Sequence, residues 1–255
     1  MILEKFRLDG KVAIVTGASM GIGRAIAVGL AEAGADIAAV ARSGGLLAEL
    51  AKEIEALGRR CLPVAADIAR VAEIERAVAA VREQYGRIDI LVNNAAINLR
   101  RPPLGVAESD WDALMNTNLK GAYFMAQEAA RVMRPQGGGA IINVCSNVSV
   151  VALPEQVMYC IGKGGLSQMT KAMALDLAGF NIRVNAIGPG LTRTHLTEPV
   201  FADPQKMDYR LARIPLHRAA EPEDMQGVAV FLASDASAYM TGHTVYVDGG
   251  WTISG

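Results

Sequence analysis

The sequence predicts one α/β domain in which a parallel sheet of seven strands is flanked by helices on both faces. Short apolar runs alternate with longer segments of helical periodicity along the whole chain, as in parallel sheets whose strands are connected by helices. The length of 255 residues suits one large domain of this class. Hydrophobic residues make up 51% of the chain and aromatic residues only 5%, which is typical of small side chains packed between helices and a buried sheet.

The expected elements follow one another without a linker, a repeat or a low-complexity tract, so we expect a single domain over residues 1–255. Strands are expected near residues 11–16, 35–41, 61–65, 88–92, 139–145, 181–187 and 243–247. Helices are expected near residues 22–33, 45–57, 71–85, 108–134, 155–178 and 221–234. Because crossovers between parallel strands are right-handed, the doubly wound strand order should be 3-2-1-4-5-6, with the seventh strand added at the end.

A glycine-rich turn separates the first expected strand from the first expected helix. The glycines of Gly17-Ala-Ser-Met-Gly21-Ile-Gly23 let main-chain N–H groups approach a phosphate, and the helix N-terminus adds partial positive charge. The loop is one residue longer than in the standard dinucleotide fingerprint. A glycine cluster can also be only a tight turn, but its position between a strand and a helix favours a Rossmann-like nucleotide site.

Tyr159 and Lys163 lie four residues apart in the expected helix 155–178 and therefore share one of its faces. The ammonium group is expected to lower the pKa of the phenol from its ordinary value of about 10. A phenol tuned in this way can exchange a proton with a carbonyl or an alcohol. Alone, the pair would also suit a solvated helix face. Ser146, at the end of the fifth expected strand, and the glycine turn favour the catalytic interpretation.

Further motifs occur in order along the chain. They are Asp67, Asn93-Asn94-Ala95-Ala96, Asn116-Thr-Asn118-Leu, Ser146, Tyr159-x-x-x-Lys163, Pro189-Gly190 and Val247-Asp248-Gly249-Gly250. With these motifs and the glycine turn, the chain resembles the short-chain dehydrogenase/reductase family over essentially its whole length. The resemblance implies an NAD(P)-dependent oxidoreductase that interconverts a secondary alcohol and a ketone by hydride transfer.

The resemblance assigns catalytic roles to Asn118, Ser146, Tyr159 and Lys163. Tyr159 would be the general acid in reduction and the general base in oxidation, Lys163 would lower its pKa and hold the nicotinamide ribose, and Ser146 would bind the substrate oxygen. Asn118, preferred to Asn116 because the family asparagine precedes a leucine, would interrupt its helix and keep a water that links Lys163 to solvent. Without the family pattern, Asn118 would be interpreted as a helix cap or a solvated residue.

The resemblance also implies the coenzyme contacts. At the glycine turn these are Gly17, Ser19, Met20, Gly21, Ile22 and Gly23. Elsewhere they are Arg42, Asp67, Ile68, Asn94, Ala95, Tyr159, Lys163, Pro189, Gly190, Thr192 and Thr194. Asp67 and Ile68 would contact the adenine ring, and residues 189–194 would hold the nicotinamide carboxamide. Thr192 stands where the family usually has an apolar residue.

The choice between NADP and NAD depends on the end of the second expected strand, where an acidic residue would bind the adenosine ribose and favour NAD. Asp36 is the first residue of that strand, at the far end from the glycine turn, and is therefore rejected as the residue that binds the ribose. The acidic position of the family corresponds to Ala41, and Arg42 follows it. The guanidinium of Arg42 can pair with a 2′-phosphate, which favours NADP. Met20 stands where many NADP-dependent relatives carry a second basic residue, and Arg42 could also be only solvated, so NAD stays open.

The substrate is expected from residues 97–102 and from both ends of the chain, which resemble sugar-acid and polyol members such as 2-deoxygluconate and gluconate dehydrogenases. Arg100 or Arg101 would then lie near a substrate carboxylate, unless the pair only fixes a surface loop. A 3-oxoacyl thioester (acyl-carrier-protein) reductase and a non-catalytic cofactor-binding regulator are the alternatives. Residues 191–220 carry three prolines and no clear period; they would cover the substrate as a mobile lid or form an ordinary surface excursion.

The remaining features concern the expected partners, metal content and localisation of the protein. A net charge of −1 gives no field that would attract nucleic acid. The N-terminus lacks the pattern of a signal peptide, and no apolar run reaches the ~18 residues of a membrane span. The three cysteines and three histidines show no metal-ligand spacing. A cytoplasmic protein with a small-molecule substrate, no bound metal and a homotetrameric assembly, as in the family, is therefore expected.

Overall fold

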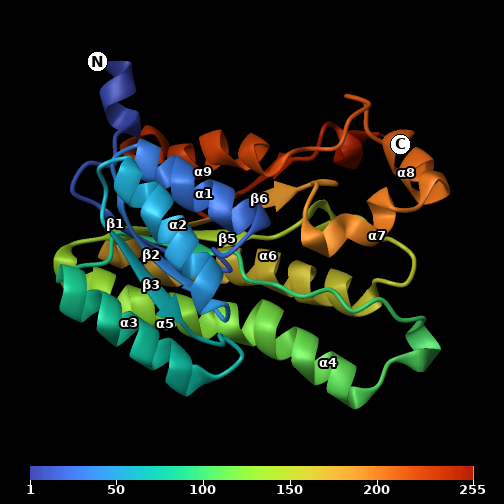
Figure 1. Ribbon diagram of the computed structural model, residues 1–255, viewed down its shortest axis with the longest axis horizontal. Coiled ribbons are helices and arrows are strands. Elements are labelled where there is room, and N and C mark those ends of the chain that lie inside the picture. The colour runs from blue at the N-terminus through green and yellow to red at the C-terminus, as the bar shows by residue number, and fades with distance from the viewer. Residues whose placement is uncertain (255) are drawn as a thin grey trace.

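The computed structural model describes residues 1–254 and contains a parallel sheet of seven strands (Figure 1). The strands are β1 Val12–Thr16, β2 Asp36–Ala41, β3 Cys61–Ala65, β4 Ile90–Asn93, β5 Gly139–Val144, β6 Ile182–Pro189 and β7 Thr244–Val247. Their order across the sheet is β3-β2-β1-β4-β5-β6-β7, and every neighbouring pair is parallel. The expected doubly wound order is confirmed.

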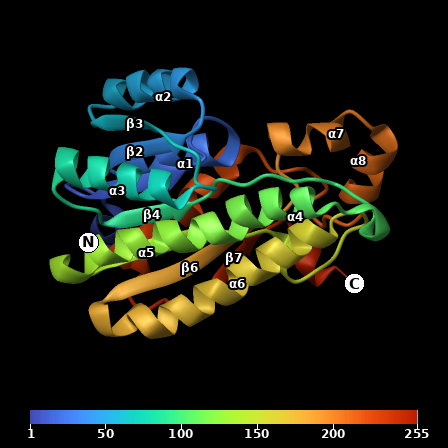
Figure 2. The same cartoon turned by 90° about the horizontal axis from the view of Figure 1, so that it is seen from below.

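Helices cover both faces of the sheet, as Figures 1 and 2 show. One face is covered by α1 Gly21–Glu32, α2 Gly44–Ala56 and α9 Gln226–Ala233, and the other by α3 Val71–Tyr85, α5 Ala122–Met133 and α6 Val157–Leu177. Alternate residues of each strand point to opposite faces. In β1, Ala13 and Val15 therefore pack with α1 and α9, whereas Val12 and Ile14 pack with α3 and α5. Two apolar layers hold the strands rigidly.

The helix expected at residues 108–134 is interrupted. It consists of α4 Glu108–Met115, a π-helical turn η3 Asn116–Gly121 and α5. Two glycines of α6 explain why this region lies so close to its neighbour. A β-carbon on Gly162 would approach Leu114 to 3.2 Å, and one on Gly165 would approach Leu119 to 3.0 Å. Glycine in a helix costs about 1 kcal/mol relative to alanine, and here it permits the close packing of two helices.

The segment 191–220, in which no periodicity was expected, contains three short helices. They are η7 His195–Thr197, α7 Glu198–Phe201 and α8 Pro204–Leu211. Figure 1 shows α7 and α8 in orange at one end of the molecule, beyond the carboxyl ends of the strands. The helix expected at 221–234 is divided into a 3₁₀ turn, η8 Pro222–Met225, and α9. The remaining α-helices end within two residues of the expected bounds.

Candidate active site

The glycine turn joins β1 to α1 and is tightly packed against β4. Gly17 and Gly21 have φ angles of +64° and +55°, which residues with a β-carbon rarely adopt. A β-carbon on Gly23 would lie 2.3 Å from the carbonyl oxygen of Gly17 and equally close to the amide nitrogen of Asn94. Met20 precedes α1 and forms no side-chain cap, so the first N–H groups of the helix have no side-chain acceptor from that position.

The chain after β4 is tied to the glycine turn by hydrogen bonds. The Thr16 hydroxyl accepts from the main-chain N–H groups of Asn94 and Ala95 at 3.0 and 3.1 Å. The side-chain amide of Asn94 donates to the carbonyl oxygens of Thr16 and Gly17 at 3.0 and 3.2 Å. These contacts join the carboxyl ends of β1 and β4 into one rigid edge of the site.

Tyr159 and Lys163 lie on α6 beside the end of β5, and both are buried. The ammonium group of Lys163 donates a 2.6 Å hydrogen bond to the carbonyl oxygen of Val144 and lies 5.8 Å from the centroid of the Tyr159 ring. Burial lowers the pKa of Lys163 to about 8, although Cys145 acts in the opposite direction. The ammonium is thus held close to the phenol, on the same helix face, as the spacing predicted.

The pKa of Tyr159 differs from the expectation. Burial raises it, Cys145 and Cys160 raise it further, and the Ser146 hydroxyl lowers it by less. The lowered pKa that we expected from Lys163 is therefore wrong for this structure. The reason is physical: the ammonium is bonded to Val144, and the loss of hydration of a buried phenolate outweighs the attraction of that charge.

Ser146 and Asn118 approach the same region from β5 and the π-helical turn. The Ser146 hydroxyl donates to the side-chain oxygen of Asn147 at 3.2 Å and accepts from the N–H of Val148 at 3.3 Å. Asn118 is 1% exposed, and its side chain forms two 2.8 Å hydrogen bonds with the main chain of Ile97. The helix is interrupted where Asn118 was expected to interrupt it, and the Asn118 side chain fixes the segment that leads from β4 to Arg100.

A cavity of about 80 Å³ opens between these residues and the 191–220 segment. Ser146 and Tyr159 lie on its wall, together with polar and apolar side chains from five separate parts of the chain. The other lining residues are Asn98, Arg100, Asn147, Val148, Leu153, Gln156, Gly190, Leu191, Leu196, Thr197, Val200, Arg210 and Trp251. A phenol, a hydroxyl and two guanidinium groups thus face one small space.

The two arginines of the expected substrate segment have different surroundings. Arg101 is exposed, and its guanidinium donates to the carboxylate of Asp110 at 2.8 Å. Arg100 is half-buried and lines the cavity with Tyr159. Of the two arginines between which the sequence did not decide, Arg100 is the one that the structure brings to the site.

The start of the 191–220 segment lies over the glycine turn. Gly190 is packed so closely that a β-carbon would approach the Cα of Asp248 to 2.7 Å, and one on Gly21 would approach the Thr194 methyl group to 3.2 Å. Thr192 is 2% exposed, and its hydroxyl donates to the carbonyl oxygen of Gly190 at 3.2 Å. A threonine is thus accommodated at this position because its hydroxyl has a main-chain acceptor.

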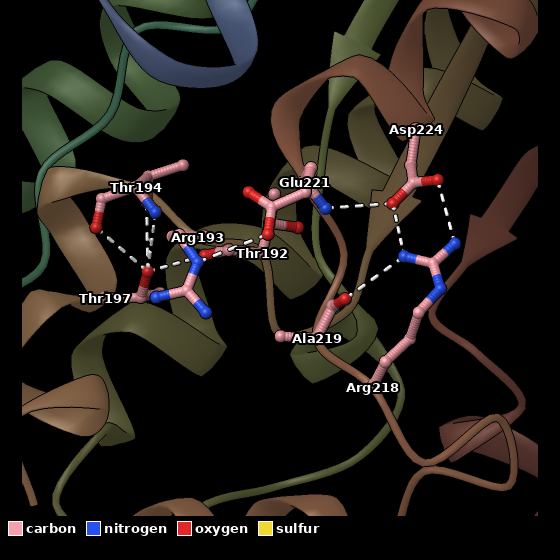
Figure 3. Close-up of polar contacts among 8 residues, drawn as sticks. All are labelled: Thr192, Arg193, Thr194, Thr197, Arg218, Ala219, Glu221 and Asp224. Carbon is pink, nitrogen blue, oxygen red and sulfur yellow. Dashed lines mark hydrogen bonds and ion pairs between the residues drawn. The ribbon is translucent and has the colours of Figure 1, made fainter.

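The two ends of the segment are joined at its base (Figure 3). Thr192 and Ala220 form a parallel bridge, with main-chain hydrogen bonds from Arg193 to Ala220 and from Ala220 to Leu191, both at 2.8 Å. The side chain of Arg193 pairs with Glu221 at 3.2 Å. The guanidinium of Arg218 forms two bonds with the carboxylate of Asp224, at 2.7 and 2.9 Å, as Figure 3 shows.

Comparison with known proteins decides the family. A family model described as enoyl-(acyl carrier protein) reductase matches residues 17–252. The 2-dehydro-3-deoxy-D-gluconate 5-dehydrogenase of Escherichia coli (strain K12) is 44% identical over 256 residues, which cover 98% of this chain and 99% of that protein. The chain belongs to the short-chain dehydrogenase/reductase family.

Two further members of the short-chain dehydrogenase/reductase family are informative. A crystal structure of a gluconate 5-dehydrogenase from Burkholderia cenocepacia J2315, in complex with NADP and tartrate, superposes with a TM-score of 0.97 at 39% identity and covers all of both chains. The 3-oxoacyl-[acyl-carrier-protein] reductase of Thermotoga maritima is 42% identical and covers 97% of this chain and 100% of that protein. The chain is accordingly an NAD(P)-dependent oxidoreductase that acts on CH–OH groups.

The residues at the glycine turn fit the dinucleotide coenzyme of the short-chain dehydrogenase/reductase family. The turn has no room for a β-carbon at Gly17 or Gly23, and the uncapped N-terminus of α1 suits a pyrophosphate. Asp67 and Ile68 follow β3, and the main-chain N–H of Asp67 is held by Glu73 at 2.7 Å. Asp36 lies at the start of β2, the opposite end from the glycine turn, and Arg59 and Arg60 bind its carboxylate.

Several residues of the cavity were not predicted from the sequence. Arg210 and Trp251 reach it from the 191–220 segment and from the C-terminal turn, and Gln156 stands just before α6. Asn98 and Arg100 were within the segment assigned to the substrate. Nothing in the local pattern around Arg210 predicts its position, because that position depends on how an aperiodic segment folds back over β5 and β6.

Residues 1–254 contain no group of three or more His, Cys, Asp or Glu side chains arranged to hold a metal ion. Within the same range, no helix has the length and apolar composition needed to span a membrane.

Proposed function

We propose that the protein is an NADP-preferring dehydrogenase that interconverts the hydroxy and keto forms of a sugar acid. Tyr159 exchanges the proton with the substrate oxygen, and Ser146 binds that oxygen. Lys163 supplies positive charge beside the phenol and holds the nicotinamide ribose. The coenzyme supplies or accepts the hydride. Asn118 positions the Ile97–Arg100 segment and, at the π-helical turn, keeps the water that connects Lys163 to solvent.

The position of Arg100 is the main observation that supports a sugar acid as the substrate. It lines the same small cavity as Ser146 and Tyr159, and no ion pair of its side chain is found within residues 1–254. A guanidinium in such a place binds a carboxylate with two parallel hydrogen bonds. The amides of Asn98 and Gln156, 3.5 Å apart on the same wall, offer donors and acceptors for sugar hydroxyl groups.

The relatives support this substrate class. The Escherichia coli relative is named for a keto-deoxy sugar acid and the Burkholderia cenocepacia relative for gluconate. Tartrate, present in the latter crystal, is also a hydroxy acid. We infer the same kind of substrate here, with a secondary alcohol beside Tyr159 and the carboxylate toward Arg100.

The NADP preference rests on the end of β2. Ala41 ends the strand without a carboxylate that would repel a 2′-phosphate, and Arg42 follows it as an exposed side chain. The guanidinium of Arg42 would bind that phosphate with two parallel hydrogen bonds. The NADP in the Burkholderia cenocepacia crystal supports the choice, and NAD is the alternative coenzyme.

A 3-oxoacyl-[acyl-carrier-protein] reductase is the second candidate, because the Thermotoga maritima enzyme is nearly as similar in sequence as the sugar-acid dehydrogenases. An acyl thioester has no carboxylate for Arg100. The third candidate, a non-catalytic cofactor-binding regulator, would leave the buried Tyr159–Lys163 pair without a use. Direct assays separate the three.

We further propose a lid, an assembly and a compartment. The 191–220 segment would close over the substrate, since its helices face the cavity through Leu196, Val200 and Arg210. The exposed apolar side chains Ile161 and Leu175 on α6 suit a homotetramer. Three free cysteines suit a reducing cytoplasm.

The decisive experiment is a screen with both coenzymes. NADP⁺ and NAD⁺ are each supplied with gluconate-type acids, neutral polyols and steroid alcohols, and NADPH and NADH with keto sugar acids and acetoacetyl thioesters. We expect the highest kcat/KM for a hydroxy or keto sugar acid with NADP(H). Efficient reduction of acetoacetyl thioesters without turnover of any sugar acid would replace this proposal with the second candidate.

A further inference from the structure

A second arginine faces the cavity, and it is carried by the 191–220 segment. Arg210 lies on α8 and is half-buried, and it lines the same space as Arg100, Ser146 and Tyr159. Arg100 comes instead from the chain between β4 and α4. Two guanidinium groups from separate parts of the fold thus border a cavity that also contains the reactive phenol.

Neither guanidinium is paired with a carboxylate in residues 1–254. Other arginines at this end of the molecule pair with carboxylates, as Arg101 does with Asp110 and Arg193 with Glu221. Within residues 1–254, the side chains of Arg100 and Arg210 form no hydrogen bond and no ion pair. Burial lowers the pKa of Arg210, and the charges of Arg100 and Arg213 lower it further, whereas Tyr209 raises it.

The guanidinium of Arg210 lies over an aromatic ring that belongs to a small apolar cluster. The guanidinium lies 5.4 Å from the centroid of the ring of Trp251, which is buried. Val200 and Ile214 of the same segment pack with Trp251 and Leu191 in a small apolar cluster. An unpaired cation held near a second one is costly unless an anion binds between them.

We propose that Arg210 is a specificity residue that binds the substrate carboxylate together with Arg100. The carboxylate then connects α8 to the segment after β4 and draws the 191–220 segment over the cavity. This inference rests on the proposed function and adds a prediction to it. Selection of an acid over a neutral polyol depends on a residue of the 191–220 segment as well as on one of the core.

The test compares acid and neutral substrates in matched variants. In Arg210→Gln, we expect kcat/KM for a sugar acid to fall about 10- to 100-fold, mainly through KM, because two charge-assisted hydrogen bonds are lost. Turnover of a neutral polyol should change less than about threefold. Arg210→Lys keeps the charge but not the planar fork of donors. Its kcat/KM for the sugar acid should fall less than that of Arg210→Gln.

Arg213→Gln is the matched control. Arg213 is the second residue after α8, is exposed, and stacks on Tyr209 outside the cavity. The Arg213→Gln variant should keep the wild-type kcat/KM for both the acid and the neutral substrate. If Arg210→Gln lowers kcat/KM equally for the acid and the neutral substrate, Arg210 has a structural role. If kcat/KM for the acid does not fall, Arg210 does not bind the substrate. Either result overturns the inference.

A binding measurement separates this inference from the proposed reaction. The chain has two tryptophans, and Trp251 lies beside Arg210. In a background with both Trp111→Phe and Tyr159→Phe, in which turnover is blocked, titration with D-gluconate in the presence of NADP⁺ should change the Trp251 fluorescence, with a Kd at least about 10-fold weaker when Arg210→Gln is added. Such binding without any turnover by the wild type would contradict only the reaction. Turnover of gluconate that is independent of Arg210 would contradict only the inference, as would the absence of any fluorescence change if the wild type turns gluconate over.

Discussion

The ammonium group of Lys163 lies 2.6 Å from the carbonyl oxygen of Val144, and this hydrogen bond anchors α6 to the end of β5. The group is 2% exposed, so its charge is held in a place that burial makes unfavourable. Its hydrogen-bond acceptor is a main-chain oxygen that has no charge to neutralise it. The buried lysine should therefore add a contribution of its own to the pH dependence of stability in the alkaline range, which a variant without the ammonium group isolates.

The stability difference between the wild type and Lys163→Met should change between pH 8 and pH 10.5. Below about pH 8 the lysine is protonated in both the folded and the unfolded protein, so the folded protein bears the full free-energy cost of burying the charge. Above about 10.5 it is neutral in both, and the cost has disappeared. Across this pH range, the free energy of unfolding of the wild type should therefore rise by about 3 kcal/mol relative to that of the variant, as measured by urea unfolding. A constant difference would show that Lys163 titrates normally.

Tyr159→Phe should lower kcat by about 10²- to 10⁴-fold, because the proton donor of reduction is removed while the ring remains. Tyr159 is 9% exposed and packs with Leu114, Val148 and Met158, so phenylalanine keeps this packing. Coenzyme affinity, measured by the fluorescence of bound NADPH, and the unfolding midpoint should stay close to those of the wild type. An unchanged kcat would favour a role other than catalysis.

Gly23→Ala should abolish coenzyme binding and lower the free energy of unfolding by about 1–3 kcal/mol. Alanine would normally stabilise a helix, but its methyl group would lie 2.3 Å from the carbonyl oxygen of Gly17. Gly45→Ala is the control, because Gly45 is also helical and has no atom within 4 Å of an added β-carbon. It should be as stable as the wild type or more stable by up to about 1 kcal/mol.

Arg42→Ala should raise the KM for NADP⁺ at least about 10-fold and leave that for NAD⁺ nearly unchanged, since only NADP⁺ carries the 2′-phosphate. Asp36→Asn is the contrasting variant. Its carboxylate accepts hydrogen bonds from Arg60 and lies beside Arg59, and despite burial these contacts hold the pKa of Asp36 below its usual value. This change should destabilise the protein but leave the ratio of the two KM values intact.

The sheet and its helices could be predicted because their signals are local. Every strand of the sheet has an apolar run of its own, and residues such as Ala13 and Ile14 pack on opposite faces as alternation requires. The interruption at Asn116–Gly121 was expected only from the family pattern around Asn118. The hydrophobic period by itself predicted one continuous helix, because a π-helical turn inserts a residue without breaking the apolar character of the segment.

Two aspects of the site were not predictable from local sequence. The pKa of Tyr159 depends on the burial of the phenol and on the direction in which the Lys163 ammonium points, and a spacing of four residues fixes neither. Arg210 reaches the cavity only because the chain between Thr192 and Ala220 folds back on itself. Such long-range placement leaves no periodic signal in the sequence.

The bridge between Thr192 and Ala220 has a consequence for how this protein could diversify. The chain leaves the core and returns to it at adjacent points, fastened by main-chain bonds and by Arg193 with Glu221. Changes within residues 195–217 that keep the packing of Val200 and Ile214 on Trp251 therefore leave both junctions in place. A new repertoire of substrates would be acquired by grafting one stretch of chain, while the nucleotide-binding half is inherited unaltered.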